Sequence, residues 1–570
     1  MYYQITCPQP TTHFLHLSLI VENPSETLRL QLAAWRPGRY QLQNYAKNIY
    51  SFEVFNESKE KLPFKKINNN LWEIQTYKAK KIEVRYTYLA NKMDAGGSWV
   101  DEEQWYINWI NCIFYVVGRE WEKYQLHLDI PTFWKVASSL PYQNNILFGE
   151  NYEDVIESPI ICSPTLQIKS YTLNQSNFHI AIQGKVNLYW EKIIEHFEAF
   201  TKAQIQLFGD FPCKDYYFLY EIVPFTFYHG VEHTNSTIIV LGSDVSFNFS
   251  EKYKEFLGVS SHELFHTWNI KRIRPSEMQP YDYTKENYFP TGFVAEGITT
   301  YYGDLMLLRS GVFTWKDYAD ELNRILKLYS ENYGKLSLLE ASTELWIDGY
   351  EKIIPHRKPS IYAKGCLVSL ILDLEIRKAT QNQCSLDDVM RILWNEYKKA
   401  DYKGYTLEKF VNIISEMAGK DVAKDWLEKC ILGNNDLIKR LGRILNDFGV
   451  SLKKIPSKEI SERNYGFRTK TEGNKILVVD IFPNSPAEGI LSVEDELIAI
   501  DGRKIMNEMN FLLEGKKNIE ISLFRNAQLK NVRLNVSSYT YFDTFNVEIF
   551  ERKDATKMQN FVTWAGNLTR

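Results

Sequence analysis

The feature that most constrains this chain is a His-Glu-x-x-His segment that begins at His262 and ends at His266. On an α-helix, positions i and i+4 lie on one face, so both imidazoles can point at a single zinc ion. Glu263 lies about 100° further round the helix, beside that ion, where it can take a proton from a water molecule. With only ten histidines among 570 residues, a chance match at this spacing is uncommon. The segment therefore predicts a zinc-binding helix rather than two unrelated histidines.

Two histidines are not enough, because a catalytic zinc takes three protein ligands and keeps one position open. The next helical stretch offers Glu296, 30 positions after His266, which leaves room for a loop and a returning helix. Its neighbours are apolar or small, so an unpaired carboxylate there is costly unless a cation compensates it. The alternative is a carboxylate that stabilises the start of a helix. We expect Glu296 to be the third ligand.

Composition bounds the remaining possibilities. A chain of 570 residues, 44% of them hydrophobic and 24% charged, is long enough for about three or four domains. The net charge of −4 gives no electrostatic case for nucleic acid or membrane, so neither is expected as a partner. The seven widely spaced cysteines include no Cys-x-x-Cys pair, which argues against a disulfide framework or a cysteine zinc site. The sequence shows no signal-peptide pattern and no apolar run of membrane-spanning length, so a cytoplasmic location is expected.

Periodicity divides the chain into regions of different character. Residues 1–170 alternate apolar with polar side chains, which is typical of half-buried strands. The clearest strand-like stretches are 15–21, 28–32, 82–88 and 126–130. The turn from Trp35 to Tyr40 has aromatic anchors, and a structural corner is favoured there over a substrate contact.

Residues 171–445 change to helical spacing near residue 186, with strand-like runs at 216–223 and 237–241 before the His-Glu helix. Further helices are expected at 294–310, 316–333, 361–379, 386–399 and 406–418. A mixed segment followed by a helical bundle is an α+β arrangement. Residues 455–540 return to strand patterns, and the aromatic tail 541–570 suits docking onto the body.

Two longer runs resemble the glycyl aminopeptidases, a family of gluzincin metallopeptidases. These are His-Glu-Leu-Phe-His-Thr-Trp-Asn-Ile-Lys-Arg-Ile-Arg-Pro over 262–275 and Glu-Gly-Ile-Thr-Thr-Tyr-Tyr-Gly-Asp over 296–304. The resemblance covers nearly the whole chain and implies one zinc ion per chain. It also implies removal of N-terminal residues, often Gly or Ala, from peptides with a free N-terminus.

The fold that this resemblance implies is multi-domain α+β. It consists of a β-rich N-terminal domain (1–170), a thermolysin-like zinc peptidase domain with a mostly helical C-terminal half (171–445), a small PDZ-like β domain (455–540) and a C-terminal tail (541–570).

Two more site positions follow from the likeness. Gly230 and Glu232 match a Gly-x-Met-Glu-Asn segment of related alanyl-type aminopeptidases, whose glutamate binds the substrate's α-ammonium; a surface carboxylate is the alternative. Val231 and His233 depart from that pattern. Tyr362 matches a Tyr-x-Lys-Gly segment whose tyrosine donates to the oxyanion; the alternative is one core tyrosine among 36.

The third segment carried over by likeness is Tyr465-Gly466-Phe467, which resembles the carboxylate-binding loop of PDZ domains. Its backbone N–H groups would bind a peptide C-terminus, and a purely structural role is the alternative.

The partners of the zinc ligands stay open at this point. Thr300 stands where thermolysin-type enzymes carry an Asp, so Asp304 or Asn269 is a candidate to orient a ligand histidine. The basic residues of the loop after the helix either hold a peptide carboxylate or fix the loop by ion pairs; they are Lys271, Arg272 and Arg274.

The function expected from these observations is a zinc-dependent aminopeptidase, with Glu263 and Tyr362 catalytic. One alternative is a zinc endopeptidase with the same centre, which would also cleave N-acetylated peptides. Another is a scaffold that binds peptide C-termini through the PDZ-like region without catalysis.

Overall fold

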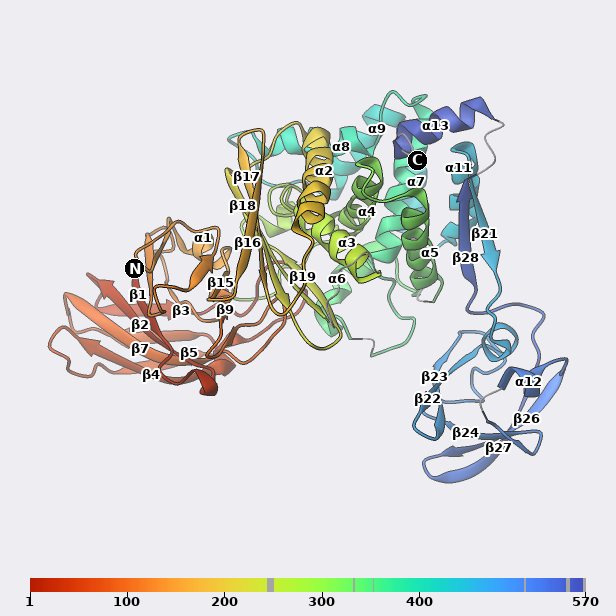
Figure 1. Cartoon of the computed structure of the whole chain (residues 1–570), viewed down its shortest axis with the longest axis horizontal. Coiled ribbons are helices and arrows are strands. Elements are labelled where there is room, and N and C mark those ends of the chain that lie inside the picture. Colours follow the sequence, from red (N-terminus) through yellow and green to blue (C-terminus); the bar gives the residue numbers. More distant parts are fainter. Residues whose placement is uncertain (243–250, 332–333, 352, 507–508, 550–553, 567–570) are drawn as a thin grey trace.

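The computed structural model describes residues 1–242, 251–331, 334–351, 353–506, 509–549 and 554–566. The molecule is elongated (Figure 1), with a β-rich region at one end, a sheet covered by helices in the middle and a small β region at the other end. The predicted β-rich N-terminal region and helical middle are therefore confirmed. In the part of the chain that the structure describes, each helix is too short or too polar to cross a membrane.

The N-terminal β region is built from three sheets, in the strand orders β13-β14-β11-β1-β2-β7-β4, β10-β3-β6-β5 and β12-β15-β9-β8. Their bounds are β1 Tyr2–Thr6, β2 Phe14–Glu22, β3 Thr27–Gln31, β4 Ile49–Asn56, β5 Phe64–Asn68, β6 Leu71–Gln75, β7 Lys81–Leu89, β8 Trp99–Val100, β9 Trp105–Ile107, β10 Tyr115–Val116, β11 Tyr124–Leu128, β12 Lys135–Ala137, β13 Tyr142–Gln143, β14 Ile146–Gly149 and β15 Ile160–Ser163. Strands β2, β3, β7 and β11 confirm the alternation read from the sequence, because their inward side chains share one core. The short helix α1, Tyr152–Ile156, closes this region.

A five-stranded sheet begins the middle of the molecule, in the order β16-β17-β18-β20-β19. Its bounds are β16 Gln167–Leu173, β17 Ser176–Gln183, β18 Asp215–Ile222, β19 Phe227–Glu232 and β20 Ser236–Gly242. The predicted runs at 216–223 and 237–241 are β18 and β20, and they pair in parallel. β19 runs antiparallel to β20 at the edge of the sheet. The segment around Gly230, which lies between the two predicted runs, is thus itself a strand.

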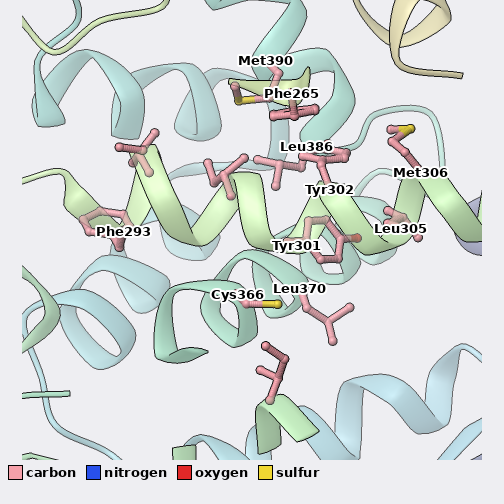
Figure 2. Packing of buried hydrophobic residues seen from close by; sticks show 14 of the residues in the cluster. Phe265, Phe293, Tyr301, Tyr302, Leu305, Met306, Cys366, Leu370, Leu386 and Met390 are labelled. Carbon is pink, nitrogen blue, oxygen red and sulfur yellow. The ribbon is translucent and has the colours of Figure 1, made fainter. Parts of the chain in front are cut away.

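Helices pack against one another beyond this sheet (Figure 1). Their bounds are α2 Trp190–Phe208, α3 Glu251–Phe265, α4 Thr299–Arg309, α5 Trp315–Glu331, α6 Leu338–Asp348, α7 Ala363–Ala379, α8 Leu386–Tyr397, α9 Leu407–Ala418, α10 Lys420–Trp426 and α11 Leu437–Asp447, with π-helical turns η5 Phe293–Ile298 and η6 Leu427–Ile431. Figure 2 shows Leu386 and Met390 of α8 on one side of the helix formed by η5 and α4, and Cys366 and Leu370 of α7 on its other side. All of them belong to one core. The Phe265 and Tyr302 rings stack with centroids 4.8 Å apart, which ties the end of α3 to α4.

All five helices expected after the His-Glu segment are present, the first as η5 followed by α4, and their ends lie within two residues of the expected ones. The end expected at residue 333 lies outside the described residues. The periodicity did not reveal α6, α10 or α11. The start of α6 carried a signal, since Ser337 and Glu340 form a reciprocal capping box.

The C-terminal β region has its own core and its own sheet, in the order β22-β23-β24-β26-β27, with β25 beside β24. The bounds are β22 Phe467–Glu472, β23 Lys475–Ile481, β24 Glu496–Ile500, β25 Arg503–Lys504, β26 Asn518–Arg525 and β27 Gln528–Asn535, with the π-helical turn η7 Ser461–Tyr465 and helix α12 Met509–Leu513. Strands β21 Val450–Ile455 and β28 Thr544–Ile549 pair antiparallel with each other. They lie before and after the C-terminal β region in the sequence and connect it to the helical part of the molecule. Helix α13, Ala555–Ala565, then packs on the main core, so the expected docking of the tail is confirmed.

Candidate active site

His262, His266 and Glu296 converge although they come from two separate elements. His262 lies in the last turn of α3 and His266 directly follows this helix, so their Nε2 atoms are 3.0 Å apart. Glu296 Oε2 from η5 lies 3.5 Å from His266 Nε2 and 3.8 Å from His262 Nε2. The three side chains therefore present one ligand atom each to a common point.

The histidine orientation is fixed from behind by the loop that follows α3. His266 Nδ1 donates to the main-chain carbonyl of Asn269 at 3.0 Å, which leaves Nε2 as the acceptor nitrogen that faces Glu296. The Asn269 side chain donates to Val294 O and Thr299 Oγ1, at 2.8 and 2.9 Å, and so ties this loop to η5. Of the two candidates named from sequence, Asn269 holds the histidine. No hydrogen bond between Asp304 and either histidine is present among the described residues.

Glu296 is buried in the middle of η5, and the wider π-helical turn is a deviation from α-helix that is often found at functional sites. Its Oε1 accepts a 2.5 Å hydrogen bond from the hydroxyl of Tyr40, which belongs to the N-terminal region. Burial alone would raise the pKa of this carboxyl, but His266, His262 and Tyr40 together hold it below its usual value. Glu296 is therefore kept as an anion beside two imidazoles.

The donor set of His262, His266 and Glu296 fits zinc. Two imidazoles and one carboxylate are a recurrent catalytic zinc set, and Zn–N bonds of about 2.0–2.1 Å place such donors roughly 3.3 Å from one another. The separations of 3.0, 3.5 and 3.8 Å lie around this value. A second group, Glu232, Glu263 and His266, also lies close together, but it has one imidazole and two carboxylates. The first group is the better match to a zinc centre.

Glu263 lies beside this centre and is buried. Its Oε2 has no hydrogen-bond partner among the described residues. A Cβ on Gly230 would overlap its Oε1, so only glycine lets β19 pass this close to the carboxylate. Burial raises the pKa of Glu263, and Glu232 and Glu296 add to the rise while His266 opposes it. A dication at the centre would favour the ionised form.

Glu232 lies at the end of β19 with its side chain buried toward the same centre. Gly38 of the N-terminal region lies against it, because a Cβ there would come within 2.5 Å of Glu232 Oε2. Gly38 has a φ of +79°, a backbone conformation that favours glycine. The turn around Gly38 and the Glu232 carboxylate are thus packed against each other at the site.

These residues line a single cleft of about 1060 Å³, together with Tyr362. Tyr362 is the residue just before α7 and lies near Glu296 and Tyr350. Burial, with Glu296 and Tyr350 nearby, raises its pKa well above the usual value, so its hydroxyl remains a donor. The structure brings every residue of the predicted zinc site into contact with this cleft.

The turn at residues 35–40 was expected to be a structural corner only. It also contributes residues to the candidate site. Trp35 is fully buried and packs on Tyr281 and Trp346, as a corner anchor would. The same turn places Gly38 and Arg39 in the cleft wall and Tyr40 on Glu296. The segment Arg-Pro-Gly-Arg-Tyr combines turn residues with polar side chains, which is a pattern compatible with a functional site. The local sequence does not indicate which part of the molecule this turn faces.

The basic residues after α3 are used for structure. Lys271 is fully buried and its Nζ lies 2.7 Å from Glu157 Oε2, which joins the N-terminal region to the middle of the molecule. Arg272 donates to Thr234 O and Thr267 O, and Arg274 stacks 3.8 Å over the Tyr281 ring. The sequence left two roles open for these residues, holding a peptide carboxylate or fixing the loop. The observed contacts match the second role.

The segment Tyr465-Gly466-Phe467 lies at the start of β22, in the C-terminal β region. Gly466 has a φ of +75°, and its N–H donates to Glu462 O at 3.1 Å. Its carbonyl accepts from Phe482 N at 2.8 Å. The N–H of Gly466 is thus already used within the chain, and a role for this loop in binding a carboxylate remains a prediction.

Comparisons with known proteins agree with the geometry. Residues 2–164 match the peptidase M61 N-terminal domain, and residues 255–368 match the M61 glycyl aminopeptidase domain. No curated protein matches the sequence. Among solved structures, an aminopeptidase N family protein from Idiomarina loihiensis is 26% identical over 100% of both chains, with a TM-score of 0.90.

A more distant likeness is to an M1 zinc metallopeptidase from Deinococcus radiodurans, 12% identical, with a TM-score of 0.47 over 76% of this chain and 94% of that one. A mutant of the Deinococcus enzyme, solved with Tyr-Ser-Ala bound, is 13% identical with a TM-score of 0.46 over the same shares of the two chains. The stronger matches support a peptidase, because two segments of this chain, 2–164 and 255–368, are similar to domains of the peptidase M61 family.

Proposed function

We propose that this protein is a zinc-dependent aminopeptidase that removes the N-terminal residue, with Gly or Ala preferred, from peptides with a free amino terminus. The observation that carries the proposal is the convergence of His262, His266 and Glu296 beside the buried Glu263, in a cleft that Glu232 also lines. The match of residues 255–368 to the M61 glycyl aminopeptidase domain supports the same reaction.

The roles follow from position and charge. His262, His266 and Glu296 would hold one zinc ion, which supplies Lewis acidity for the attacking water and the scissile carbonyl. Glu263 takes the proton from the water and passes it to the leaving amine. The Tyr362 hydroxyl donates to the oxygen that becomes negative as the water attacks. Glu232 accepts hydrogen bonds from the substrate's α-ammonium and so sets the point of cleavage one residue from the end.

We also propose the division expected from the sequence, with the zinc peptidase domain at 171–445 and a PDZ-like domain at 455–540. The separate core and sheet of the C-terminal region support the second of these. Peptide C-termini are its proposed ligands, along the edge strand β22.

The deciding experiment separates metal binding from catalysis. Glu263→Gln is expected to keep bound zinc and lose at least a thousandfold in kcat, whereas Glu296→Ala is expected to lose the metal itself. Zinc content by elemental analysis and turnover of glycyl, alanyl and bulky amide substrates give the two readouts. Full activity of the Glu263→Gln variant would contradict the proposed mechanism.

The same substrates with an acetylated amino terminus test the role of Glu232. An aminopeptidase does not cleave these acetylated substrates, because the acetylated nitrogen carries no positive charge that Glu232 can bind. Equal cleavage of free and acetylated substrates, lost on chelation, would instead identify a zinc endopeptidase. Absence of chelator-sensitive cleavage, with binding of peptide C-termini retained, would identify a scaffold.

A further inference from the structure

The turn beside Glu232 carries positively charged side chains that the reaction above does not use. Arg39 follows Gly38 in the turn that lies on Glu232, and both residues line the cleft. Arg36, which is only 1% exposed and does not line the cleft, is a second cation close enough to act on Arg39. A third cation, Lys92, approaches from the neighbouring loop.

The carboxylate of Asp94 forms the ion pairs of this cluster, with Lys92 and with Arg39. Asp94 Oδ2 lies 2.8 Å from Lys92 Nζ and 3.5 Å from Arg39 Nη2, and its Oδ1 accepts from Gly96 N. The short contact to Lys92 and the longer one to Arg39 show that Asp94 is mainly engaged by the lysine. No further ion pair to Arg36 or Arg39 is present among the described residues.

Several guanidinium donors in this cluster lack a partner. Arg39 Nε, Arg36 Nε and Arg36 Nη2 are buried without a hydrogen bond among the described residues. The only bond of the Arg36 side chain among those residues is from Nη1 to Ala95 O, at 3.3 Å. Buried cationic donors without acceptors are costly, so the Arg39 guanidinium, which lines the cleft, is suited to an anion that enters it.

Apart from Glu232, which the proposed reaction uses to bind the α-ammonium, the other groups that face this corner add no negative charge. His229, which lines the same cleft, stays neutral because burial, Arg39 and Arg36 lower its pKa to about 3. The Tyr350 ring lies under the Arg39 guanidinium at 5.6 Å and its hydroxyl lies near Gly38 O, so it holds the arginine in the wall without adding charge.

We propose that Arg39, supported by Arg36, forms an anion subsite that binds a carboxylate of the substrate peptide. The inference rests on the proposed function, in which Glu232 binds the α-ammonium. Glu232 and Arg39 then offer opposite charges in the same cleft, one to the α-ammonium and one to a carboxylate of the same peptide. Two carboxylates are chemically equivalent there: the side chain of an N-terminal Asp or Glu, and the free C-terminus of a very short peptide.

The test uses two matched substrate pairs on the whole zinc-loaded protein. Glutamyl and glutaminyl amides differ only in the side-chain charge, and glycylglycine and glycylglycinamide differ only in the C-terminal charge. A charge-assisted hydrogen bond is worth about 1.5–3 kcal/mol, so kcat/KM for the charged member of one pair should be roughly 10- to 100-fold higher. The pair that shows the difference identifies the carboxylate that Arg39 binds.

Arg39→Gln should bring the charged-to-neutral ratio for that pair close to one, mainly through KM, while Arg39→Lys should keep part of it. Arg503→Gln, which changes an exposed arginine of the C-terminal region, should leave the ratio as in the wild type. If Arg39→Gln does not fold, product inhibition of the wild type gives the same answer: glutamate, or a short peptide acid, should inhibit more strongly than its amide.

Equal kcat/KM for both members of both pairs, or a ratio that survives Arg39→Gln, would overturn the subsite. If neutral glycyl substrates are still cleaved in a chelator-sensitive way, that failure leaves the proposed function intact. If no free-amine substrate is cleaved at all, the proposed function itself has failed.

Discussion

At the residue scale, the candidate site depends on a hydroxyl from a distant part of the chain. Tyr40 donates to Glu296 Oε1 across 256 positions of sequence. A hydrogen bond of this kind fixes the direction of a carboxylate lone pair and lowers the cost of holding an anion in a buried place. The N-terminal region thus supports the candidate metal site, although none of the three predicted ligands belongs to it.

Removing this hydroxyl should weaken metal binding. Tyr40→Phe is expected to raise the Kd for zinc by roughly 10- to 100-fold, as is usual when an outer partner of a metal ligand is lost. Competition with a chelating dye measures the change. Tyr45→Phe is the matched control, because the buried Tyr45 hydroxyl makes no hydrogen bond among the described residues. Identical zinc affinity in both variants would show that Tyr40 does not position Glu296.

A second residue-scale feature is the buried lysine of the Tyr-Ala-Lys-Gly segment. Lys364 is 1% exposed, and its Nζ donates to Asn434 Oδ1 at 3.1 Å. Burial lowers its pKa from 10.5 to about 8. Because the unfolded chain binds this proton more tightly than the folded one, stability from this group rises as pH increases from about 8 to about 10.5.

The corresponding test compares Lys364→Met with the wild type in urea between pH 7 and 10. The variant's advantage in unfolding free energy should shrink with rising pH, by up to about 3 kcal/mol for a shift from 10.5 to about 8. Lys378→Met removes an exposed lysine from the same helix and should show no such trend. A pH-independent difference for Lys364→Met would refute the assignment.

At the element scale, the site depends on how closely η5 approaches α7. A Cβ on Gly297 would lie 2.5 Å from Gly365 Cα, so the two backbones touch where both residues are glycine. This contact brings Glu296, next to Gly297, and Tyr362, at the start of α7, to the same cleft. Neither helix can separate without moving one functional side chain away from the other.

A single methyl group tests this contact. Gly297→Ala should cost about 1–3 kcal/mol of stability through overpacking and also reduce kcat, because the displaced turn carries Glu296. Chemical denaturation and turnover measure the two effects. Gly442→Ala in α11 meets nothing closer than 3.9 Å, so it should be neutral or stabilising by about 1 kcal/mol. Equal behaviour of the two variants would contradict the close approach.

At the scale of the whole molecule, segments far apart in sequence lock the regions together. Lys271 and Glu157 form a buried ion pair between the N-terminal region and the loop after α3. The C-terminal helix α13 returns to the main core, where Trp564 is fully buried. Its indole Nε1 donates to the Tyr301 hydroxyl at 2.9 Å, and Arg309 Nε donates to Trp564 O at 2.9 Å. The end of the chain is thus part of the helical core.

Truncating this one side chain should destabilise the whole catalytic region. Trp564→Ala is expected to cost about 3–5 kcal/mol, because a large buried ring and its hydrogen bond are lost together. Thermal unfolding followed by circular dichroism measures it, with zinc present throughout. Tyr539→Ala changes an aromatic residue that is 77% exposed and should have almost no effect. An unchanged Tm for Trp564→Ala would mean that α13 does not stabilise the core.

The sequence by itself determined those parts of the protein that depend on local spacing. Alternation along β2 and β7 specified strands because one face of each meets water, and the spacing of His262 and His266 placed two imidazoles on one face. Glu296 was reachable by the same reasoning, since a carboxylate among apolar neighbours needs a cation. Helix α6 could have been found from its capping residues.

Only the tertiary structure decided what lies opposite these residues. The turn at 35–40 has the same local character whether it packs as a corner or faces a cleft, so its sequence could not place Tyr40 on Glu296 or Arg39 beside Glu232. Likewise, a lysine such as Lys271 is expected on the surface from its sequence alone. It is buried here because Glu157, from the N-terminal region, compensates its charge. Contacts across long stretches of chain depend on how whole sheets and helices pack, and no local pattern records that packing.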